Sequence, residues 1–535
     1  MYYFDAVVFD LDGVITKTAL VHQEAWKKAF DEYLKVVSER ENKAFAEFTY
    51  KDYLDYVDGK PRYDGVKSFL ESRNINIERG MPSDGPDKET VCGIGNKKNG
   101  IFVELLKSKG VQVYPSTIEL IRKLREEGIK IGVASSSKNC RHILESAGIE
   151  HLFQTRVDGV VSSELKLRGK PEGDIFVLAA HNLNSSPSGS IVVEDAASGV
   201  EAGRNGGFGL VLGIARKDNS DDLLRHYADI AVDDLSSIDI SMLNDWFLKE
   251  PVYIFEAWDD NKKLRDWADY FKKNENIYIN ERYLSNAKGI FSSGKKNILF
   301  LDYDGTLTPI VAKPDLAVLS SDMKNILGKL SSQYTVAIVS GRLGEDVQKL
   351  VGIDGIFYAG SHGFDIKGPS FSLIQKDAEA IIPLMSDIAV NIKDELGKID
   401  GVIIEDKKFS LAVHYRLLKD DKYLDDIRNC INNIINDNHS LRLMEGKKVF
   451  EIMPRIDWDK GKAIRWIMQA LGLRFDEVNV VYIGDDTTDE DAFRIIRTRG
   501  VGVLVSGNSR RSAADFRVSS VDEVKKLFEY MLSKG

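Results

Sequence analysis

The chain has 535 residues, of which 43% are hydrophobic and 29% are charged. At about 100 to 200 residues per domain, this length predicts roughly three or four globular units, and it excludes a short peptide, a fibre and a disordered tail. The 73 Lys and Arg residues against 83 Asp and Glu residues give a net charge of -10, which is opposite to the basic surface that nucleic acid attracts. An anionic substrate would therefore need a local cationic pocket.

The sequence favours a cytoplasmic protein with no membrane and no nucleic-acid partner. Its first residues, MYYFDAVVFDLDGV, contain no basic region and carry acids within the apolar run, and no stretch approaches about 18 uninterrupted apolar residues. Cys92, Cys140 and Cys430 lie far apart and form no C-x-x-C pair. We expect these cysteines to be buried free thiols in a reducing compartment.

Apolar β-branched runs that end in polar residues recur along the chain and predict buried parallel strands. Amphipathic stretches at 116–127 and 322–330 are typical of the helices that separate such strands. This alternation predicts an α/β fold with doubly wound parallel sheets, which bind ligands at the carboxyl ends of their strands. The predicted strands are Ala6–Phe9, Ile131–Ala134, Ile191–Val193, Asn297–Leu301, Thr335–Val339 and Asn479–Ile483.

The strings DLDGV at 10–14 and DYDGT at 302–306 form a diverged internal repeat. In each half the second Asp is followed, in the same order, by a Ser that ends a strand, a Lys before a helical stretch and an Asp that ends a third strand. The Lys and the last Asp are 25 residues apart in both halves. An extra length of roughly 85 residues lies in a different interval of each half, as expected for a cap domain inserted at two different points. The marks are Asp12, Ser135, Lys170 and Asp195 in the first half, and Asp304, Ser340, Lys460 and Asp485 in the second.

These intervals predict a first domain over residues 1–245 and a second over residues 296–535. Residues 246–295 carry Leu264, Trp267, Ala268 and Phe271 at helical spacing. A helix that packs on a core face explains this spacing better than a ligand-binding cluster does. We predict a helical linker between the two domains.

With these marks the chain resembles the haloacid dehalogenase superfamily of phosphotransferases, twice over and along nearly its whole length. Phosphate monoesters hydrolyse very slowly, so an enzyme has to supply an in-line nucleophile, charge neutralisation and a proton donor for the leaving alcohol. In the second half, Asp302 is expected to form an aspartyl phosphate and Asp304 to act as acid and base. Ser340 and Lys460 are expected to bind the transferring phosphate. The expected ligands of a Mg²⁺ ion are Asp302, the carbonyl of Asp304 and Asp485, with Asp489 in the inner or outer shell.

The second half more narrowly resembles trehalose-6-phosphate phosphatase over residues 296–535. The matching strings include LDYDGTLTPI, VSGR, GSHG, HYR, MEGKKVFEIMP, DKGKA and GDDTTDEDAF. The resemblance implies hydrolysis of trehalose 6-phosphate beneath an α/β cap at about 375–455, and a related phosphorylated disaccharide stays open as the substrate. Charge pattern alone would favour an exposed strand pair for Glu405 and Lys407, and a structural role for His362 also stays open. The resemblance places Glu405, Lys407 and Glu445 on the sugar, and Arg342, Ser361 and His362 near the phosphate.

The first half resembles the β-phosphoglucomutase group over residues 1 to about 240. The matching strings are FDLDGVITKTALVHQEAW, KKN, ASSSKN, GKP and VEDAASGVEAG. The resemblance implies a helical cap at about 18–108, with Asp10 as nucleophile, Asp12 as acid and base, and Ser135 and Lys170 on the transferring phosphate. It places Asp10, the Asp12 carbonyl, Glu194 and Asp195 on Mg²⁺, and Thr18, His22, Arg62, Lys98 and Ser136 at the substrate.

One position of the cap motif departs from that group. The group has a lysine just before a glycine, where this chain has Asp58, with Lys60 nearby as a substitute. Three functions therefore stay open for the first half. It interconverts β-glucose 1-phosphate and glucose 6-phosphate, it hydrolyses a sugar phosphate, or it binds sugar phosphates without catalysis. Small-molecule sugar phosphates are the expected partners in each case, and the oligomeric state cannot be inferred.

Overall fold

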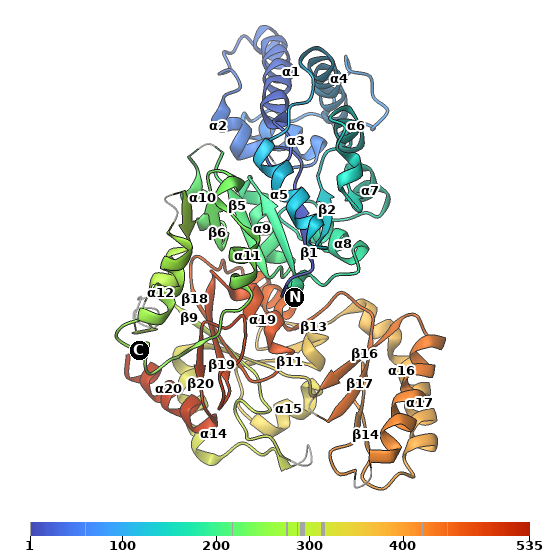
Figure 1. Cartoon of the computed structure of the whole chain (residues 1–535), viewed down its shortest axis with the longest axis vertical. Coiled ribbons are helices and arrows are strands. Elements are labelled where there is room, and N and C mark those ends of the chain that lie inside the picture. The colour runs from blue at the N-terminus through green and yellow to red at the C-terminus, as the bar shows by residue number, and fades with distance from the viewer. Residues whose placement is uncertain are drawn as a thin grey trace. The chain divides into compact units, whose positions relative to one another are not determined.

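The computed structural model of the chain describes residues 2–58, 60–216, 218–273, 276–285, 287–288, 295–311, 316–418, 421–446 and 448–534. The chain divides into two compact units. The first consists of Met1–Lys249 and Leu264–Leu284, and the second of Glu250–Lys263 and Ser285–Gly535. Each unit has an α/β core with an inserted cap (Figure 1). The predicted fold class is confirmed.

The core of the first unit is a mainly parallel sheet with the strand order β3-β2-β1-β4-β5-β6-β8 within the described residues. Among the strands that the structure describes in this sheet, only β8, at the edge, runs antiparallel to its neighbour, β6. The strands are β1 (Ala6–Phe9), β2 (Lys130–Ala134), β3 (Thr155–Val157), β4 (Ser190–Glu194), β5 (Leu210–Ile214), β6 (Ile230–Val232) and β8 (Ile277–Ile279). The helices are α5 (Pro115–Glu126), α6 (Cys140–Ser146), α7 (Gly159–Glu164), α8 (Asp174–Asn182), α9 (Ala197–Asn205), α10 (Ser220–Arg225) and α11 (Ile240–Trp246).

Alternate residues of β1 enter different hydrophobic clusters, because successive side chains of a strand point to opposite faces. Val7 and Phe9 pack with α5 and α6, whereas Ala6 and Val8 pack with α8 and α9. The sheet is therefore covered on both faces. Phe9 is in register with Val133 of β2 and Val193 of β4, so the polar residues that follow these strands meet at one edge.

The cap of the first unit is helical, as predicted. Helices α1 and α4 lie side by side in Figure 1. The cap has its own aromatic core, in which Trp26, Phe30, Phe48 and Phe69 are buried together. Its elements are α1 (Thr18–Glu41), α2 (Tyr50–Asp52), a π-helical turn (Tyr53–Val57), α3 (Arg62–Ser72) and α4 (Val91–Lys109).

The core of the second unit repeats this plan. Its sheet has the order β13-β12-β11-β10-β9-β18-β19-β20-β7 within the described residues. Leu301 of β9 is in register with Ile338 of β10 and Ile483 of β18, so these three strands also end at one edge. The strands are β7 (Val252–Tyr253), β9 (Asn297–Leu301), β10 (Thr335–Val339), β11 (Phe357–Gly360), β12 (Asp365–Lys367), β13 (Ser372–Ile374), β18 (Asn479–Gly484), β19 (Gly500–Val505) and β20 (Phe516–Val518). The helices are α14 (Ser321–Gln333), α15 (Gly344–Val351), α18 (Lys460–Ala470), α19 (Asp489–Ile496) and α20 (Val521–Lys534).

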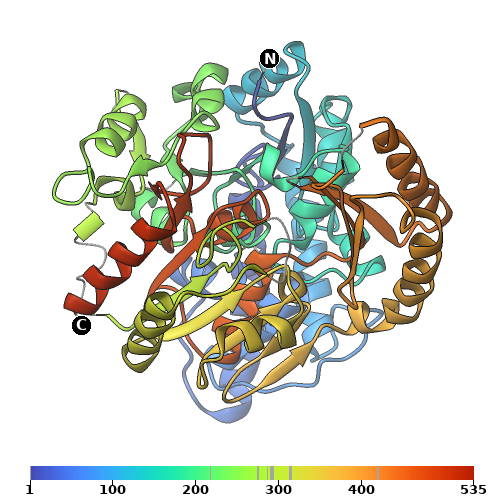
Figure 2. The same ribbon diagram turned by 90° about the horizontal axis from the view of Figure 1, so that it is seen from below.

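The cap of the second unit is an α/β cap, as predicted, and it consists of an antiparallel sheet with two helices. Helices α16 (Lys376–Leu396) and α17 (Leu424–Asp437) cover one face of the sheet in both views (Figures 1 and 2, orange). The strand order is β14-β15-β17-β16. The strands are β14 (Ile403–Asp406), β15 (Leu411–His414), β16 (Leu441–Gly446) and β17 (Val449–Pro454).

Residues 246–295 are divided between the two units. The predicted helix is present as α12 (Lys262–Phe271), with Leu264, Ala268 and Phe271 buried. In addition, β7 pairs with β20 in one sheet and β8 pairs with β6 in the other, so this range adds an edge strand to each core. Residues 274, 275, 286 and 289–294 of the predicted linker lie outside the described residues.

Two further expectations can be compared with the structure. All three cysteines are free and buried, as predicted. In the part of the chain that the structure describes, no helix is both long and apolar enough to cross a membrane.

Candidate active sites

In the second unit, Asp302 at the end of β9 is joined to Lys460 at the start of α18. Lys460 Nζ donates to Asp302 Oδ1 at 2.8 Å and to Asp489 Oδ1 at 2.6 Å, and all three residues are buried. Burial by itself lowers the pKa of Lys460, but the two carboxylates raise it well above its ordinary value. The ammonium therefore stays charged beside the expected nucleophile.

Both carboxylate oxygens of Asp489 are engaged by neighbouring donors. Oδ1 accepts the Tyr482 hydroxyl at 2.5 Å in addition to Lys460. Oδ2 accepts the backbone N–H groups of Asp485 at 2.8 Å and Asp486 at 2.9 Å. Asp489 therefore holds Lys460 and the loop after β18 in place.

The acidic residues of each unit form a cluster that fits a hard divalent cation. One oxygen from each of Asp302, Asp485 and Asp489 lies within 4.8 Å of the others, and the same holds for Asp10, Glu194 and Asp195. Carboxylate oxygens are ligands that suit Mg²⁺. Each cluster is closed by a glycine turn: Gly305 has φ +82°, and a Cβ there would lie 2.4 Å from the Asp485 carboxylate carbon. In the first unit, a Cβ on Gly13 (φ +87°) would lie 1.8 Å from Asp195 Oδ2.

Replacing Gly305 by alanine is expected to lower the free energy of unfolding by about 1 to 3 kcal/mol, because both the positive φ and the new Cβ are unfavourable there. Gly328, on the exposed side of α14, makes a matched control, because a Cβ there would have no other atom within 4 Å. Gly328→Ala should be neutral or stabilising by up to about 1 kcal/mol. Urea unfolding of both variants tests this, and equal effects would contradict it.

Asp304 lies apart from the buried cluster and forms a bidentate pair with Arg342. Arg342 Nε and a terminal guanidinium nitrogen each donate to it at 2.7 Å, and 43% of the Asp304 side chain is exposed. Arg342, assigned from its motif to the phosphate region, therefore also fixes the expected acid. Sequence reasoning did not predict this pair.

The loops after β10 and β11 are hydrogen-bonded into one cluster that contains the residues expected around the phosphate. The Arg342 N–H donates to Ser340 Oγ at 3.1 Å, and the His362 N–H donates to the Ser340 carbonyl at 2.9 Å. Ser361 and His362 adopt left-handed backbone angles, with φ 49° and 58°. Ser340, Ser361 and His362 are all buried.

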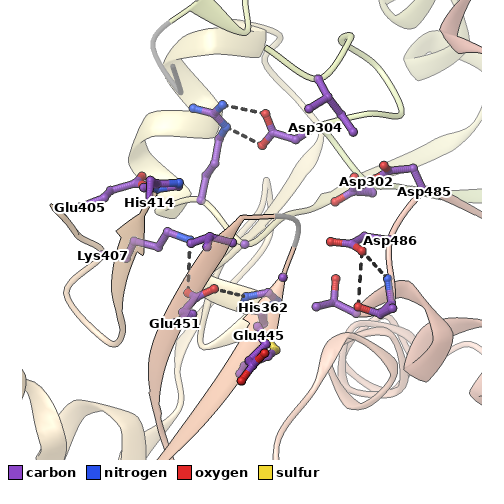
Figure 3. A pocket seen from close by; sticks show the side chains of 18 of the residues that line it. Asp302, Asp304, His362, Glu405, Lys407, His414, Glu445, Glu451, Asp485 and Asp486 are labelled. Carbon is purple, nitrogen blue, oxygen red and sulfur yellow. Dashed lines mark hydrogen bonds and ion pairs between the residues drawn. The ribbon is translucent and has the colours of Figure 1, made fainter. Parts of the chain in front are cut away.

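On the cap side, Glu451 of β17 lies between Lys407 and His362, which both point toward its carboxylate (Figure 3). Lys407 Nζ donates to Glu451 Oε1 at 3.2 Å, Ser410 Oγ donates to the same oxygen at 2.6 Å, and His362 Nε2 is 3.7 Å from Oε2. Burial opposes ionisation of Glu451, but Lys407, His362 and Ser410 hold its pKa well below the usual range.

The two other predicted sugar residues also have partners. Glu405 Oε2 is 2.8 Å from His414 Nε2 (Figure 3). Glu445 accepts from Arg428 at 2.5 Å, and half of its side chain is exposed, so it lies at the rim. The cleft has a volume of about 220 Å³, and its lining includes Asp302, Asp304, Arg342, His362, Glu405, Lys407, Glu445, Glu451, Lys460 and Asp485.

In the first unit, Lys170 holds Asp10 and Glu194 in the same way. Its Nζ donates to Asp10 Oδ1 at 2.7 Å and to Glu194 Oε1, with all three residues buried. The Asp12 N–H donates to Asp10 Oδ2 at 2.8 Å. The Ser135 N–H donates to the Val157 carbonyl, and Ser135 Oγ accepts the Ser137 N–H at 3.1 Å.

Asp12 contacts the cap through Thr18 and His22 of α1. Thr18 Oγ1 donates to Asp12 Oδ1, and His22 Nε2 lies 3.5 Å from the same oxygen. His22 Nδ1 is 2.5 Å from Lys98 Nζ, and its ring stacks on Phe102. Burial, together with the Lys98 and Arg62 charges, lowers the pKa of His22 well below its usual value. The imidazole is therefore neutral and can accept from Lys98.

Arg62 connects the cap to the core through amide side chains. It donates to Asn99 Oδ1 at 2.7 Å, and Asn139, in the loop after β2, donates to the same oxygen at 2.8 Å. Lys60 instead donates to Ser68 Oγ at 2.9 Å. The pocket has a volume of about 400 Å³, and its lining includes Asp10, Asp12, His22, Asp58, Lys60, Arg62, Lys98, Asn99, Ser135, Ser136, Lys138, Asn139 and Lys170.

Comparison with known proteins finds a matching family for each half of the chain. A trehalose-phosphatase family model matches residues 300–522, and a haloacid dehalogenase-like hydrolase model matches residues 4–207. A trehalose-phosphate phosphatase of Mycobacterium leprae is 33% identical over 430 residues, which cover 77% of this chain and 91% of that protein. The chain belongs to the trehalose-phosphatase family.

Two further relatives match the first half of the chain and nearly the whole chain, respectively. A β-phosphoglucomutase of Mycobacterium bovis is 44% identical over 237 residues, covering 44% of this chain and 90% of that protein. An uncharacterized glycosyl hydrolase of Mycobacterium tuberculosis is 35% identical over 525 residues, covering 96% of this chain. The chain spans only 37% of the length of that relative.

The trehalose-phosphatase domain and the β-phosphoglucomutase-like domain hold their lysines with acids from different positions. In the first, Asp489 fills the space beside Gly484, where a Cβ would lie 2.3 Å from the Asp489 carboxylate carbon. In the second, Glu194 fills the space beside Gly199, where a Cβ would lie 1.6 Å from Glu194 Oε1. The acid and the glycine have exchanged places, so each domain keeps one further carboxylate for its lysine beside that of Asp302 or Asp10.

Glu451 is the main site residue of the trehalose-phosphatase domain that sequence reasoning missed. A signal for it was present, because Phe450, Glu451 and Ile452 alternate along a strand. Phe450 and Ile452 enter the cap core, which directs Glu451 to the opposite face. A lone acid in an apolar strand marks a position that needs a partner.

Proposed function

We propose that the second unit hydrolyses trehalose 6-phosphate to trehalose and phosphate. The observation that carries this is the position of the Asp302–Lys460 pair in a cleft whose cap side presents the buried Lys407–Glu451 pair. The family assignment, and the M. leprae relative named a trehalose-phosphate phosphatase, support this substrate.

The chemistry follows from the positions of these groups. Asp302 attacks phosphorus, and the sugar oxygen leaves with a proton from Asp304, which Arg342 keeps in place. Lys460 offsets the negative charge of the transferring phosphoryl group, and Lys460 and Ser340 together hold its oxygens. Asp304 then takes a proton from the water that attacks the aspartyl phosphate, which releases phosphate and regenerates Asp302. A Mg²⁺ ion held by Asp302, the Asp304 carbonyl and Asp485 would offset the repulsion between carboxylate and phosphate.

The charges of the cleft suit a neutral sugar that carries one phosphate. Three of its cations are each paired with a carboxylate: Arg342 with Asp304, Lys407 with Glu451 and Lys460 with Asp302. The cap side adds Glu405 and Glu445, which can accept hydrogen bonds from sugar hydroxyls. A second phosphate would meet these acids and be repelled.

Glu451→Gln is expected to lower kcat/KM for trehalose 6-phosphate by about 10- to 100-fold, because sugar contacts made away from the phosphate help to position it. Turnover of p-nitrophenyl phosphate, which lacks the sugar, should change by less than about threefold. Glu379→Gln, an exposed position on α16, is the matched control. Equal losses on both substrates would show that Glu451 does not read the sugar.

For the first unit we propose transfer of phosphate between sugar positions, interconverting β-glucose 1-phosphate and glucose 6-phosphate. The supporting observation is a second cationic region of the pocket, where Arg62 is held by amide oxygens rather than by a carboxylate. With Asn99 and Asn139 it can bind the phosphate that is not reacting, while Lys170 serves Asp10. This role needs no lysine at position 58.

The product separates this function from its alternatives. With the second unit silenced by Asp302→Asn, the protein is given β-glucose 1-phosphate and glucose 1,6-bisphosphate and followed by phosphorus NMR. Formation of glucose 6-phosphate supports the mutase, whereas release of inorganic phosphate alone indicates a phosphatase. No conversion, despite binding of a beryllofluoride phosphate mimic, would leave a sugar-phosphate-binding module. We place both activities in the cytoplasm, where buried free thiols persist.

A further inference from the structure

The helical cap of the first unit joins its core through two chain segments. Residues 13–17 lead into α1, and residues 110–114 return from α4. The Lys17 N–H donates to the Gln112 carbonyl at 2.8 Å, and the Tyr114 N–H donates to the Ile15 carbonyl at 2.9 Å. The position of the cap therefore depends on this two-stranded junction.

Arg216, which follows β5, contacts both segments at once. Its Nε donates to the Gly13 carbonyl at 3.1 Å, and its guanidinium carbon lies 3.6 Å from the centre of the Tyr114 ring. A terminal nitrogen donates to Asp234 at 2.6 Å, and Asp234 is itself held by Ser116 at 2.8 Å. Only 10% of the arginine side chain is exposed. One planar group thus anchors both ends of the junction to the core.

The contact between Arg216 and the Gly13 carbonyl also affects the active site, because Gly13 directly follows Asp12. The Gly13 turn has no room for a side chain beside Asp195, and its carbonyl accepts from Arg216, so two separate contacts restrict this residue. Thr117, on α5, donates to the next carbonyl, that of Val14, at 2.7 Å. A shift of the junction would therefore move both the cap and Asp12.

We propose that Arg216 is a positioning residue that keeps the cap closed over Asp10 while the phosphate is bound covalently, a role that rests on the transfer function proposed above. In the closed state a sugar hydroxyl attacks phosphorus, the bond to the Asp10 oxygen breaks, and the hydroxyl proton passes to Asp12. In an opened state water attacks instead, the same bond breaks, a water proton passes to Asp12, and inorganic phosphate leaves.

The first readout is the partition between these two attacks. In the 535-residue chain carrying Asp302→Asn, Arg216→Gln should raise the phosphate released per isomerisation by at least about tenfold. Arg225→Gln, an exposed arginine on α10 with 75% of its side chain accessible, removes the same charge from the same unit and should leave the ratio unchanged. A change in overall rate with an unchanged ratio would overturn the role in water exclusion.

The second readout does not depend on activity. Hydrogen exchange of the Lys17 and Tyr114 amides should be faster by about tenfold in Arg216→Gln, with the α8 amides unchanged. Unchanged exchange would overturn the clamp, whereas a parent protein that forms no glucose 6-phosphate would overturn only the proposed transfer function. Asp234→Asn, which keeps the side-chain shape but weakens the anchor, should shift both readouts in the same direction and replaces Arg216→Gln if that variant does not fold.

Discussion

Asp302→Asn is expected to lower kcat for trehalose 6-phosphate hydrolysis by at least about 10⁴-fold, the scale seen when a covalent nucleophile is removed. In the parent, Lys460 Nζ donates a hydrogen bond to Asp302 at 2.8 Å. The asparagine oxygen can still accept this hydrogen bond, so the fold should persist. The amide is a poor nucleophile and cannot form the acyl phosphate. Single-turnover phosphate release, with circular dichroism as the check on folding, measures the loss.

The matched control for this variant is Asp10→Asn, which makes the same change at the same place in the other unit. It should leave trehalose 6-phosphate hydrolysis within about twofold of the parent, because each unit has its own nucleophile and lysine. Substantial hydrolysis that survives Asp302→Asn would contradict the assignment of the nucleophile.

Arg62→Ala is expected to slow the interconversion of β-glucose 1-phosphate and glucose 6-phosphate by about 30- to 1000-fold. The variant loses a charge-assisted contact to the phosphate that is not reacting, worth about 2 to 4 kcal/mol. The variant also loses the hydrogen bond from Arg62 to Asn99 Oδ1, an oxygen that accepts a second hydrogen bond from Asn139 of the core. Coupled detection of glucose 6-phosphate gives the rate.

Arg40→Ala is the control within the same cap, because Arg40 pairs with Glu89 at a position where half of its side chain is exposed. Surface pairs contribute little, so its rate should stay close to that of the parent. If Arg62→Ala behaves like this control, the second phosphate is bound elsewhere or is not bound at all.

Both cores were predictable from the sequence because buried parallel strands are local apolar runs. The strands β1 and β9 begin and end at the predicted residues. The order of Asp, Ser, Lys and Asp predicted one such core in each half, and in the structure Lys170 contacts Asp10 and Lys460 contacts Asp302.

Contacts between segments far apart in the chain could not be predicted in this way. The pairing of Arg342 with Asp304 depends on two loops meeting, and nothing in either motif specifies it. The linker has the same limit. Its helix can be predicted from the spacing of apolar residues. The pairing of β7 with one sheet and of β8 with the other depends on which edge strands still have unpaired backbone groups.

The exchange of acid and glycine between the two domains could be predicted from the sequence only in part. Glu194 and Gly199 in one domain correspond to Gly484 and Asp489 in the other. When the two halves are aligned on Lys170 and Lys460, the exchange is visible in the sequence. Whether each carboxylate reaches its lysine depends on the space that the glycine leaves. Each glycine leaves room for the other residue's carboxylate, and that complementarity requires coordinates.

The most direct test of two independent phosphotransferase units is a phosphorus NMR time course on the 535-residue chain carrying Asp10→Asn, with trehalose 6-phosphate, β-glucose 1-phosphate and glucose 1,6-bisphosphate present together. Loss of the trehalose 6-phosphate signal with matching growth of inorganic phosphate, while β-glucose 1-phosphate stays constant, is the expected result. Persistence of trehalose 6-phosphate, or continued formation of glucose 6-phosphate without the Asp10 carboxylate, would contradict it.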